Sequence, residues 1–262
     1  MLKKILAWCV HGYTALGLVA AGGIAVALFD GEPAYRFAFL LMFLATLIDA
    51  TDGTLARAIK IKEVLPRFDG RRLDDLIDFQ TYTSLPLLLI WRADLLQGEA
   101  LAWLLAPLVA SAYGFCQTTA KTDDGYFLGF PSYWNIIAFY LYVLQLPGWF
   151  ALGVILFFAL MTFVPARYLY PTHRGRLNRW TNGLGAVWAI ALVWILWRMP
   201  ATRVDGASVD PPTHVLVLIS LMFPAYYLLV SWLISLRIVI RVHRRTSRQG
   251  QPKPAPSAED FV

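Results

Sequence analysis

Charged residues are scarce in this 262-residue chain, in which Asp, Glu, Lys and Arg together make up only 15% of the sequence. A soluble domain carries about 25% charged and about 45–50% apolar residues. Here 58% of the residues are hydrophobic and the mean hydropathy is +0.55. This composition excludes a disordered chain and an ordinary water-soluble enzyme, and it indicates a protein that is solvated mainly by lipid.

Cysteine is also nearly absent, with Cys9 and Cys116 as the two copies. Neither belongs to a CxxC pair or a Cys/His cluster, which excludes a disulfide framework and a structural zinc site. The sequence shows no internal repeat. The basic excess, 23 Lys and Arg against 17 Asp and Glu, is typical of cytoplasmic loops in a membrane protein, so we expect no nucleic-acid partner.

Long apolar runs fill most of the chain. They lack the period-two alternation of barrel strands, and each is close to the roughly 20 residues that a membrane-spanning helix needs. The sequence therefore predicts an all-α integral membrane protein, a polytopic helical bundle of about eight transmembrane helices. The expected spans are 7–29, 36–58, 73–96, 99–120, 132–147, 149–169, 181–198 and 213–236.

Little of the chain remains outside these spans, so we expect one transmembrane domain over residues 1–243. The stretch 244–262 is rich in Pro, Ser and charge and is predicted to be a disordered tail. Basic residues fall at alternate ends of successive spans, which under the positive-inside rule places both termini in the cytoplasm. The basic segments are Lys3–Lys4, Lys60–Arg72, Lys121, Arg167–Arg179 and Arg237–Arg248.

Four carboxylates break the apolar pattern. Asp49 and Asp52 are three residues apart near the end of the second span, and Asp74 and Asp78 are four apart at the start of the third. Each spacing places a pair on one helix face. A charge inside a membrane helix costs about 2.5–3.5 kcal/mol on insertion scales, so these acids favour a functional explanation.

Two antiparallel helices joined by a basic loop bring these four acids together near the cytoplasmic surface. They would repel one another unless a cation lay among them, and oxygen ligands without Cys or His suit Mg²⁺, Mn²⁺ or Ca²⁺. Small residues beside the acids, Gly53 and Ala56, leave room for a bulky ligand, and Arg57 is placed for a phosphate. The alternative is that the acids pair with basic neighbours or cap helices, which we expect only for Asp75.

The pattern Asp49-x-x-Asp52-Gly53-x-x-Ala56-Arg57, followed by Gly70-x-x-x-Asp74-x-x-x-Asp78, resembles the signature of the CDP-alcohol phosphatidyltransferase family. Twelve residues separate Arg57 from Gly70, more than in the common family pattern. In this longer gap, and in the stretch 121–135, the chain is similar to the bacterial phosphatidylcholine synthases.

The resemblance implies that choline displaces CMP from CDP-diacylglycerol and that phosphatidylcholine forms. It implies a multi-pass enzyme of the bacterial inner membrane with its active site facing the cytoplasm. The partners would be CDP-diacylglycerol, choline, CMP and membrane lipids, and a homodimer is a further expectation from the family.

The resemblance also assigns roles to residues. It implies two ions of Mn²⁺ or Mg²⁺ and makes Asp78 the general base. The metal ligands would be Asp49, Asp52, Asp74 and Asp78. The CDP pocket would be formed by Asp52, Gly53, Ala56, Arg57 and Gly70.

The ammonium group of choline cannot donate a hydrogen bond, so an aromatic cage is expected to bind it. Tyr82, one turn beyond Asp78, is the first candidate, and Tyr126, Tyr133 and Trp134 follow. For the lipid phosphates the candidates are Lys121, Arg167 and Arg174, although long basic side chains at a membrane surface equally well serve as anchors.

Two alternatives remain open at this point. One is the same chemistry with another alcohol, namely serine, inositol or glycerol phosphate. The other is a cation-coupled transporter, which would also place acids in helices. Such transporters usually contain internal repeats and sites near the bilayer midplane, whereas these acids adjoin a basic loop.

Overall fold

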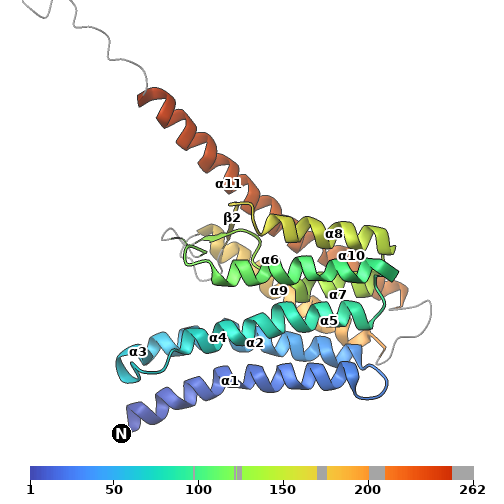
Figure 1. The fold of residues 1–262 in the computed structure, drawn as a ribbon, viewed down its shortest axis with the longest axis horizontal. Helices are drawn as coiled ribbons and strands as arrows, with labels where there is room; N and C mark the ends of the chain where they lie inside the picture. Colours follow the sequence, from blue (N-terminus) through green and yellow to red (C-terminus); the bar gives the residue numbers. More distant parts are fainter. Residues whose placement is uncertain (97, 121, 123–125, 170–175, 201–209, 250–262) are drawn as a thin grey trace, which may run out of the picture.

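The described part of the chain is a bundle of helices with one short antiparallel pair of strands that are distant in the sequence (Figure 1). A computed structural model describes residues 1–96, 98–120, 122, 126–169, 176–200 and 210–249. The first half contains α1 (Leu2–Phe29), α2 (Tyr35–Ala58), α3 (Ile61–Val64), α4 (Gly70–Asp78), the π-helical turn η1 (Phe79–Ser84), α5 (Leu85–Arg92), the 3₁₀ segment η2 (Gly98–Leu104) and α6 (Leu105–Cys116). The second half contains β1 (Tyr126–Leu128), α7 (Trp134–Leu144), α8 (Gly148–Met161), β2 (Arg167–Leu169), α9 (Arg176–Arg198), α10 (Pro211–Ser220) and α11 (Met222–Gln249).

The predicted class, a helical membrane protein, agrees with this architecture. Within the described residues, five helical stretches are long and apolar enough to cross a bilayer: Leu2–Phe29, Tyr35–Ala58, Gly98–Cys116, Arg176–Arg198 and Thr213–Ile240. Helices α7 and α8 are apolar but shorter. The expected span 73–96 is helical through α4, η1 and α5. The number of spans and the side on which the termini lie stay predictions.

The expected span 149–169 was too long. Helix α8 ends at Met161, and Arg167–Leu169 instead forms β2, antiparallel to β1, with Phe127 opposite Tyr168. Gly129, which follows β1 at φ +82°, lies directly against the carbonyl oxygen of Thr162 at the end of α8, where a Cβ would clash. Hydropathy cannot detect the end of α8, since the residues on both sides of it are mostly apolar.

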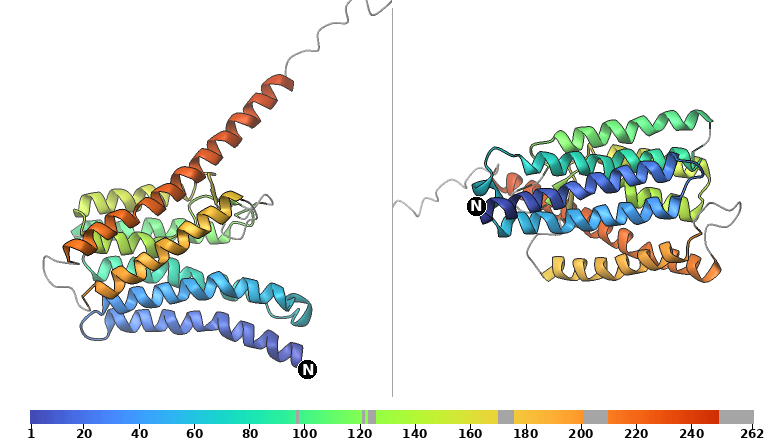
Figure 2. Two further views of the ribbon diagram at one scale, coloured as in Figure 1. Left: turned by 180° about the vertical axis from the view of Figure 1, so that it is seen from behind. Right: turned by 90° about the horizontal axis from the view of Figure 1, so that it is seen from below.

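The predicted tail also differs from the structure. Helix α11 continues through Gln249, so residues 244–249 are helical, and residues 250–262 lie outside the described part of the chain. Figure 2 shows α11 leaving the bundle as one long helix. Basic residues dominate its final turns, a composition suited to an anionic lipid surface.

Helices α1 and α2 lie antiparallel, side by side in both views of Figure 2. Small residues form the buried face of α1, including Ala7, Gly17, Ala20 and Ala21. Membrane helices gain little hydrophobic free energy from leaving lipid, so close approach over small residues is their main source of association. The pair therefore packs closely enough for side chains on α1 to reach functional residues on α2.

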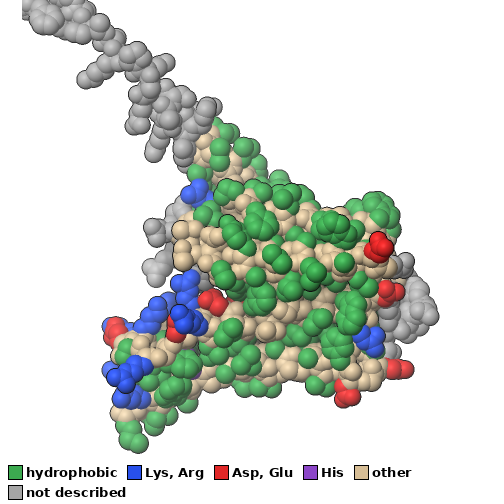
Figure 3. All heavy atoms as spheres, viewed as in Figure 1, with side chains coloured by type: hydrophobic (Ala, Val, Ile, Leu, Met, Phe, Trp, Pro, Cys, Tyr) green, Lys and Arg blue, Asp and Glu red, His purple; other side chains and the backbone are tan. Residues whose placement is uncertain are grey.

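Charge is distributed unevenly along the bundle axis. In Figure 3, Lys and Arg side chains gather, with some acidic ones among them, at the end that carries the α2–α4 connection, while the opposite end shows mainly acidic side chains. The exposed basic residues of that connection are Lys60, Lys62, Arg67, Arg71 and Arg72. This asymmetry is the one that the positive-inside rule associates with a cytoplasmic end.

We expect cysteine labelling to place the basic end in the cytoplasm. The native thiols Cys9 and Cys116 are both exposed, so the test begins from a Cys9→Ser/Cys116→Ser background. An impermeant maleimide should label Lys62→Cys and Arg245→Cys only after the cells are permeabilised. It should label Glu32→Cys, in the α1–α2 turn at the opposite end, in intact cells. Labelling of residue 62 or 245 from outside would contradict this topology.

Candidate functional site

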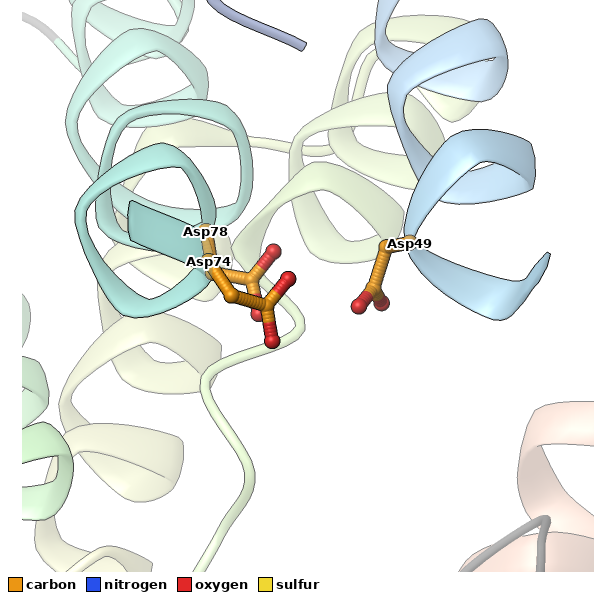
Figure 4. A group of neighbouring side chains, drawn as sticks. All are labelled: Asp49, Asp74 and Asp78. Carbon is orange, nitrogen blue, oxygen red and sulfur yellow. The ribbon is translucent and has the colours of Figure 1, made fainter. Parts of the chain in front are cut away.

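Three carboxylates meet where α2 faces α4 (Figure 4). Asp49 projects from α2, and Asp74 and Asp78 project toward it from successive turns of α4. One carboxylate oxygen from each residue lies within 4.8 Å of the others, and all three side chains are half-buried. The i, i+4 spacing on α4 places Asp74 and Asp78 on one face, as predicted, and leaves Asp75 outside the group.

The dimensions of this group fit a divalent cation. Metal–oxygen bonds of about 2.0–2.6 Å separate opposite ligand oxygens by about 4–5 Å, which matches the 4.8 Å limit of the group. The donor set consists of carboxylate oxygens alone, the chemistry that Mg²⁺, Mn²⁺ and Ca²⁺ prefer. The three residues therefore suit a hard divalent ion.

Asp52, the fourth predicted metal ligand, does not belong to this group of three. Its side chain is only 5% exposed. Its carboxylate accepts a hydrogen bond of 2.7 Å from the hydroxyl of Thr14 on α1. Thr14 could not be predicted from the sequence, because a threonine in an apolar helix is common and only the packing of α1 on α2 gives it this partner.

The start of α4 is fixed by a side-chain cap. The carboxylate of Asp69 accepts hydrogen bonds from the backbone N–H groups of Arg71 (3.1 Å) and Arg72 (3.2 Å), two of the donors that a helix start leaves unpaired. This cap determines where α4 begins, and the position of Asp74 on the helix follows from it.

Directly after Asp78 the helix widens into η1, which contains Tyr82. The Tyr82 hydroxyl donates a 2.8 Å hydrogen bond to the carboxylate of Asp49 across the gap between the helices. The ring itself is buried, at 8% exposed. Tyr82 therefore lies beside the acid group, as its spacing from Asp78 predicted, and it also orients one of the three carboxylates.

Tyr82 is the first of three tyrosines whose rings are neighbours, the tyrosine row. The ring of Tyr133 lies 6.3 Å from that of Tyr82, and the ring of Tyr227 on α11 lies 6.3 Å from that of Tyr133. Tyr133 and Tyr227 are both half-buried. Tyr227 could not be predicted from the sequence, because it lies in an apolar helix far from the motif and no local spacing indicates it.

The other two aromatic candidates lie elsewhere. Trp134 is completely buried, and its indole N–H donates to the hydroxyl of Ser111 at 2.7 Å, so it packs in the core. Tyr126 is in β1, paired with Leu169 of β2.

The small residues of the motif are close to protein side chains. A Cβ added to Gly53 would lie 3.3 Å from a guanidinium nitrogen of Arg57, and Arg57 itself is exposed and donates to the hydroxyl of Thr54 at 3.0 Å. A Cβ added to Gly70 would clash with the imidazole of His11. Ala56 is half-buried on α2.

Of the three basic candidates for lipid phosphate, only Arg167 lies within the described residues. It is half-buried in β2 opposite Leu128. Its backbone N–H donates to the hydroxyl of Ser235 on α11 at 2.6 Å. Lys121 and Arg174 lie outside the described part of the chain.

Comparison with known proteins gives a consistent set of relatives. A phosphatidylcholine synthase from Pseudomonas aeruginosa is 37% identical over 76% of this chain and 84% of its own length. One from Legionella bozemanae is 33% identical over 74% of this chain and 93% of its own. One from Rhizobium meliloti is 34% identical over 74% and 80%, respectively. No protein-family model matches the chain.

We expect the acid group to bind Mn²⁺ in the absence of any substrate. Asp49→Asn and Asp74→Asn should each weaken binding by about tenfold or more, because each removes one charged ligand. Asp75→Asn, on the adjacent residue outside the group, is the matched control and should change the affinity less than about threefold. The loss of the free-Mn²⁺ electron paramagnetic resonance signal on titration measures the affinity. Equal weakening by Asp75→Asn would show that the grouping is wrong.

Proposed function

The chain belongs to the phosphatidylcholine synthase family, and from that membership we propose how its residues transfer the phosphatidyl group of CDP-diacylglycerol to choline. The observation that carries the proposal is the group formed by Asp49, Asp74 and Asp78 between α2 and α4. The reaction forms phosphatidylcholine and releases CMP.

In the proposed reaction, the hydroxyl oxygen of choline attacks the phosphorus that carries diacylglycerol. The bond from this phosphorus to the oxygen of CMP breaks, and the hydroxyl proton passes to the carboxylate of Asp78. Asp78 is the appropriate acceptor because it lies on the α4 turn nearest Tyr82 and the tyrosine row. A base in this position lowers the barrier by removing the proton as the new bond forms.

Asp49 and Asp74 would hold Mn²⁺ or Mg²⁺ together with Asp78, and we propose two ions, with Asp52 as a ligand of the second. Bound there, the cations would neutralise the diphosphate and the charge that develops on the leaving CMP. Asp49 would be kept in place by the hydroxyl of Tyr82 and Asp52 by the hydroxyl of Thr14. Both hydrogen bonds use neutral donors, so they orient the carboxylates without cancelling their charge.

The CDP moiety would lie along the α2 face beyond the acids, toward the basic end. Gly53 and Ala56 have little side chain to obstruct a ligand there, and the exposed Arg57 guanidinium is able to reach a phosphate. We propose that Arg57 exchanges its hydrogen bond to Thr54 for one to the nucleotide. This arrangement opens the site to the cytoplasm, with the protein in the bacterial inner membrane.

Choline would bind between the acids and the tyrosine row. Its hydroxyl would point at Asp78 and its ammonium at the rings of Tyr82, Tyr133 and Tyr227. Ring centroids 6.3 Å apart allow one cation to lie within about 6 Å of two rings at once. An anionic acceptor such as glycerol phosphate would need added basic side chains facing the metals, whereas the described side chains of this row are tyrosines.

The competing functions are less well supported. Serine would need a partner for its carboxylate, and the described residues around Asp49 and Tyr82 supply acids and tyrosines instead. The relatives described above are phosphatidylcholine synthases and give no support to a transporter.

The choice of alcohol is the direct test of this function. Purified protein in detergent micelles with Mn²⁺ and CDP-diacylglycerol should release CMP rapidly with choline. Serine, inositol and glycerol 3-phosphate, tested in parallel at equal concentration, should give little release. Faster release with serine or inositol would refute the choline assignment, and no release with any alcohol would refute the transferase mechanism.

Replacing the tyrosines should separate choline binding from carboxylate positioning. Tyr133→Leu and Tyr227→Leu should each raise the choline KM about 2- to 30-fold, the equivalent of about 0.5–2 kcal/mol for an ammonium on an aromatic face. The KM for CDP-diacylglycerol should hardly change. Tyr82→Phe, which keeps the ring and removes the hydrogen bond to Asp49, should instead lower Mn²⁺ affinity.

The control is Tyr113→Leu. Tyr113 is exposed on α6 with its ring 4.9 Å from that of Phe163, outside the row. An equal rise in choline KM for Tyr113→Leu and Tyr227→Leu would contradict the proposed cage.

A further inference from the structure

Helix α1 carries none of the residues of the motif, yet one of its faces touches both acid-bearing helices. His11 packs against Gly70 at the start of α4, and Gly17 packs against Ile77 further along α4. Between them, the hydroxyl of Thr14 donates a hydrogen bond to the carboxylate of Asp52 on α2. Residues 11, 14 and 17 follow one another at intervals of three, within an arc of about 120° on the helix surface. All three are buried.

These contacts fix the position of α4 on α1 at two points. His11 and Gly17 are separated by about 9 Å along α1, and Gly70 and Ile77 by about 10.5 Å along α4, at 1.5 Å per residue. Because the two spacings nearly agree, the two contacts fix both the position of α4 along its axis and its rotation about that axis. Asp74 lies between the two contact points, so its direction depends on both.

The contacts leave no spare volume. A Cβ at Gly70 would overlap the His11 ring, and a Cβ at Gly17 would lie 2.5 Å from a methyl group of Ile77. The His11 ring cannot easily move aside, because it is 6% exposed and lies 4.4 Å from the Phe68 ring and 5.9 Å from the Trp8 ring. Small changes at this face must therefore displace α4.

We propose that His11, Thr14 and Gly17 are positioning residues that set the separation of the two acid helices, and that Gly70 is a glycine because His11 occupies the space of its side chain. The expected effect of these residues on catalysis rests on the proposed function. Mn²⁺ binding tests the interaction between α1 and the acid helices separately, because it does not depend on the alcohol.

The first test is a double-mutant cycle between the two partners. Gly70→Ala should lower Mn²⁺ affinity about tenfold and reduce kcat with it. His11→Ala/Gly70→Ala should restore the affinity to within about threefold of the wild type, since the added methyl then has space. Within the described residues Nε2 of His11 has no hydrogen-bond partner, so His11→Ala breaks no bond at that atom. An undiminished loss in the double variant, or no loss in Gly70→Ala, would overturn the proposal.

The second test stays within α1 and needs no change at the motif. Gly17→Ala should weaken Mn²⁺ binding several-fold. Gly22→Ala is the matched control, because a Cβ there meets nothing within 4 Å, and it should bind Mn²⁺ as the wild type does. If Gly17→Ala also binds like the wild type, α1 does not set the position of α4.

The third test concerns the hydroxyl of Thr14. Thr14→Val removes the donor to Asp52 and keeps the shape, whereas Thr14→Ser keeps the donor. We expect the valine variant to raise the KM for CDP-diacylglycerol at least about fivefold and the serine variant to rescue it to within about twofold. A purely packing role for Thr14 would produce the opposite order, and that result would overturn the assignment. Failure of wild-type protein to bind Mn²⁺ would refute the metal site itself instead.

Discussion

Repulsion among three carboxylates is the constraint on which the rest of the structure depends. Asp49, Asp74 and Asp78 are held with oxygens within 4.8 Å of one another, where two unit charges repel by about 4 kcal/mol at the effective dielectric of a protein surface. In lipid, the hydrophobic effect contributes little to the association of helices. The two acid helices therefore need contacts that hold them from outside the charged group, through Tyr82 on one side and helix α1 on the other.

The opposite end of the bundle is held differently, by hydrogen bonds to backbone carbonyls. The Tyr35 hydroxyl donates to the carbonyl of Arg92 at 2.8 Å, and Arg36 donates to that of Met199 at 3.2 Å. Between these contacts and the acids lies a packed core that includes Phe39, Leu89 and Ile90. The helices are thus joined by packing and hydrogen bonds away from the acids, and the polar groups that the proposed chemistry needs lie at the other end of the bundle.

The sequence predicted those parts of the site that depend on helical periodicity. Asp74 and Asp78 share a face because of their spacing, and Asp49 meets them because the connection from Ala58 to Gly70 reverses the chain. The partners of Asp52 and the place of Tyr227 depend on how distant helices pack, which local spacing does not encode. The strand Arg167–Leu169 escaped prediction for another reason, since its apolar residues have the composition of a span.

The π-helical turn at Phe79–Ser84 separates the acid-bearing part of this helix from its apolar part. A wider turn holds an additional residue, and one residue corresponds to about 100° of rotation in an α-helix. The face that α5 presents to the core is therefore out of phase with the face of α4 that carries Asp74 and Asp78. An insertion or deletion within Phe79–Ser84 would therefore rotate Asp74 and Asp78 relative to the core-facing side of α5. The sequences of α4 and α5 can change independently only while the number of residues between them is kept.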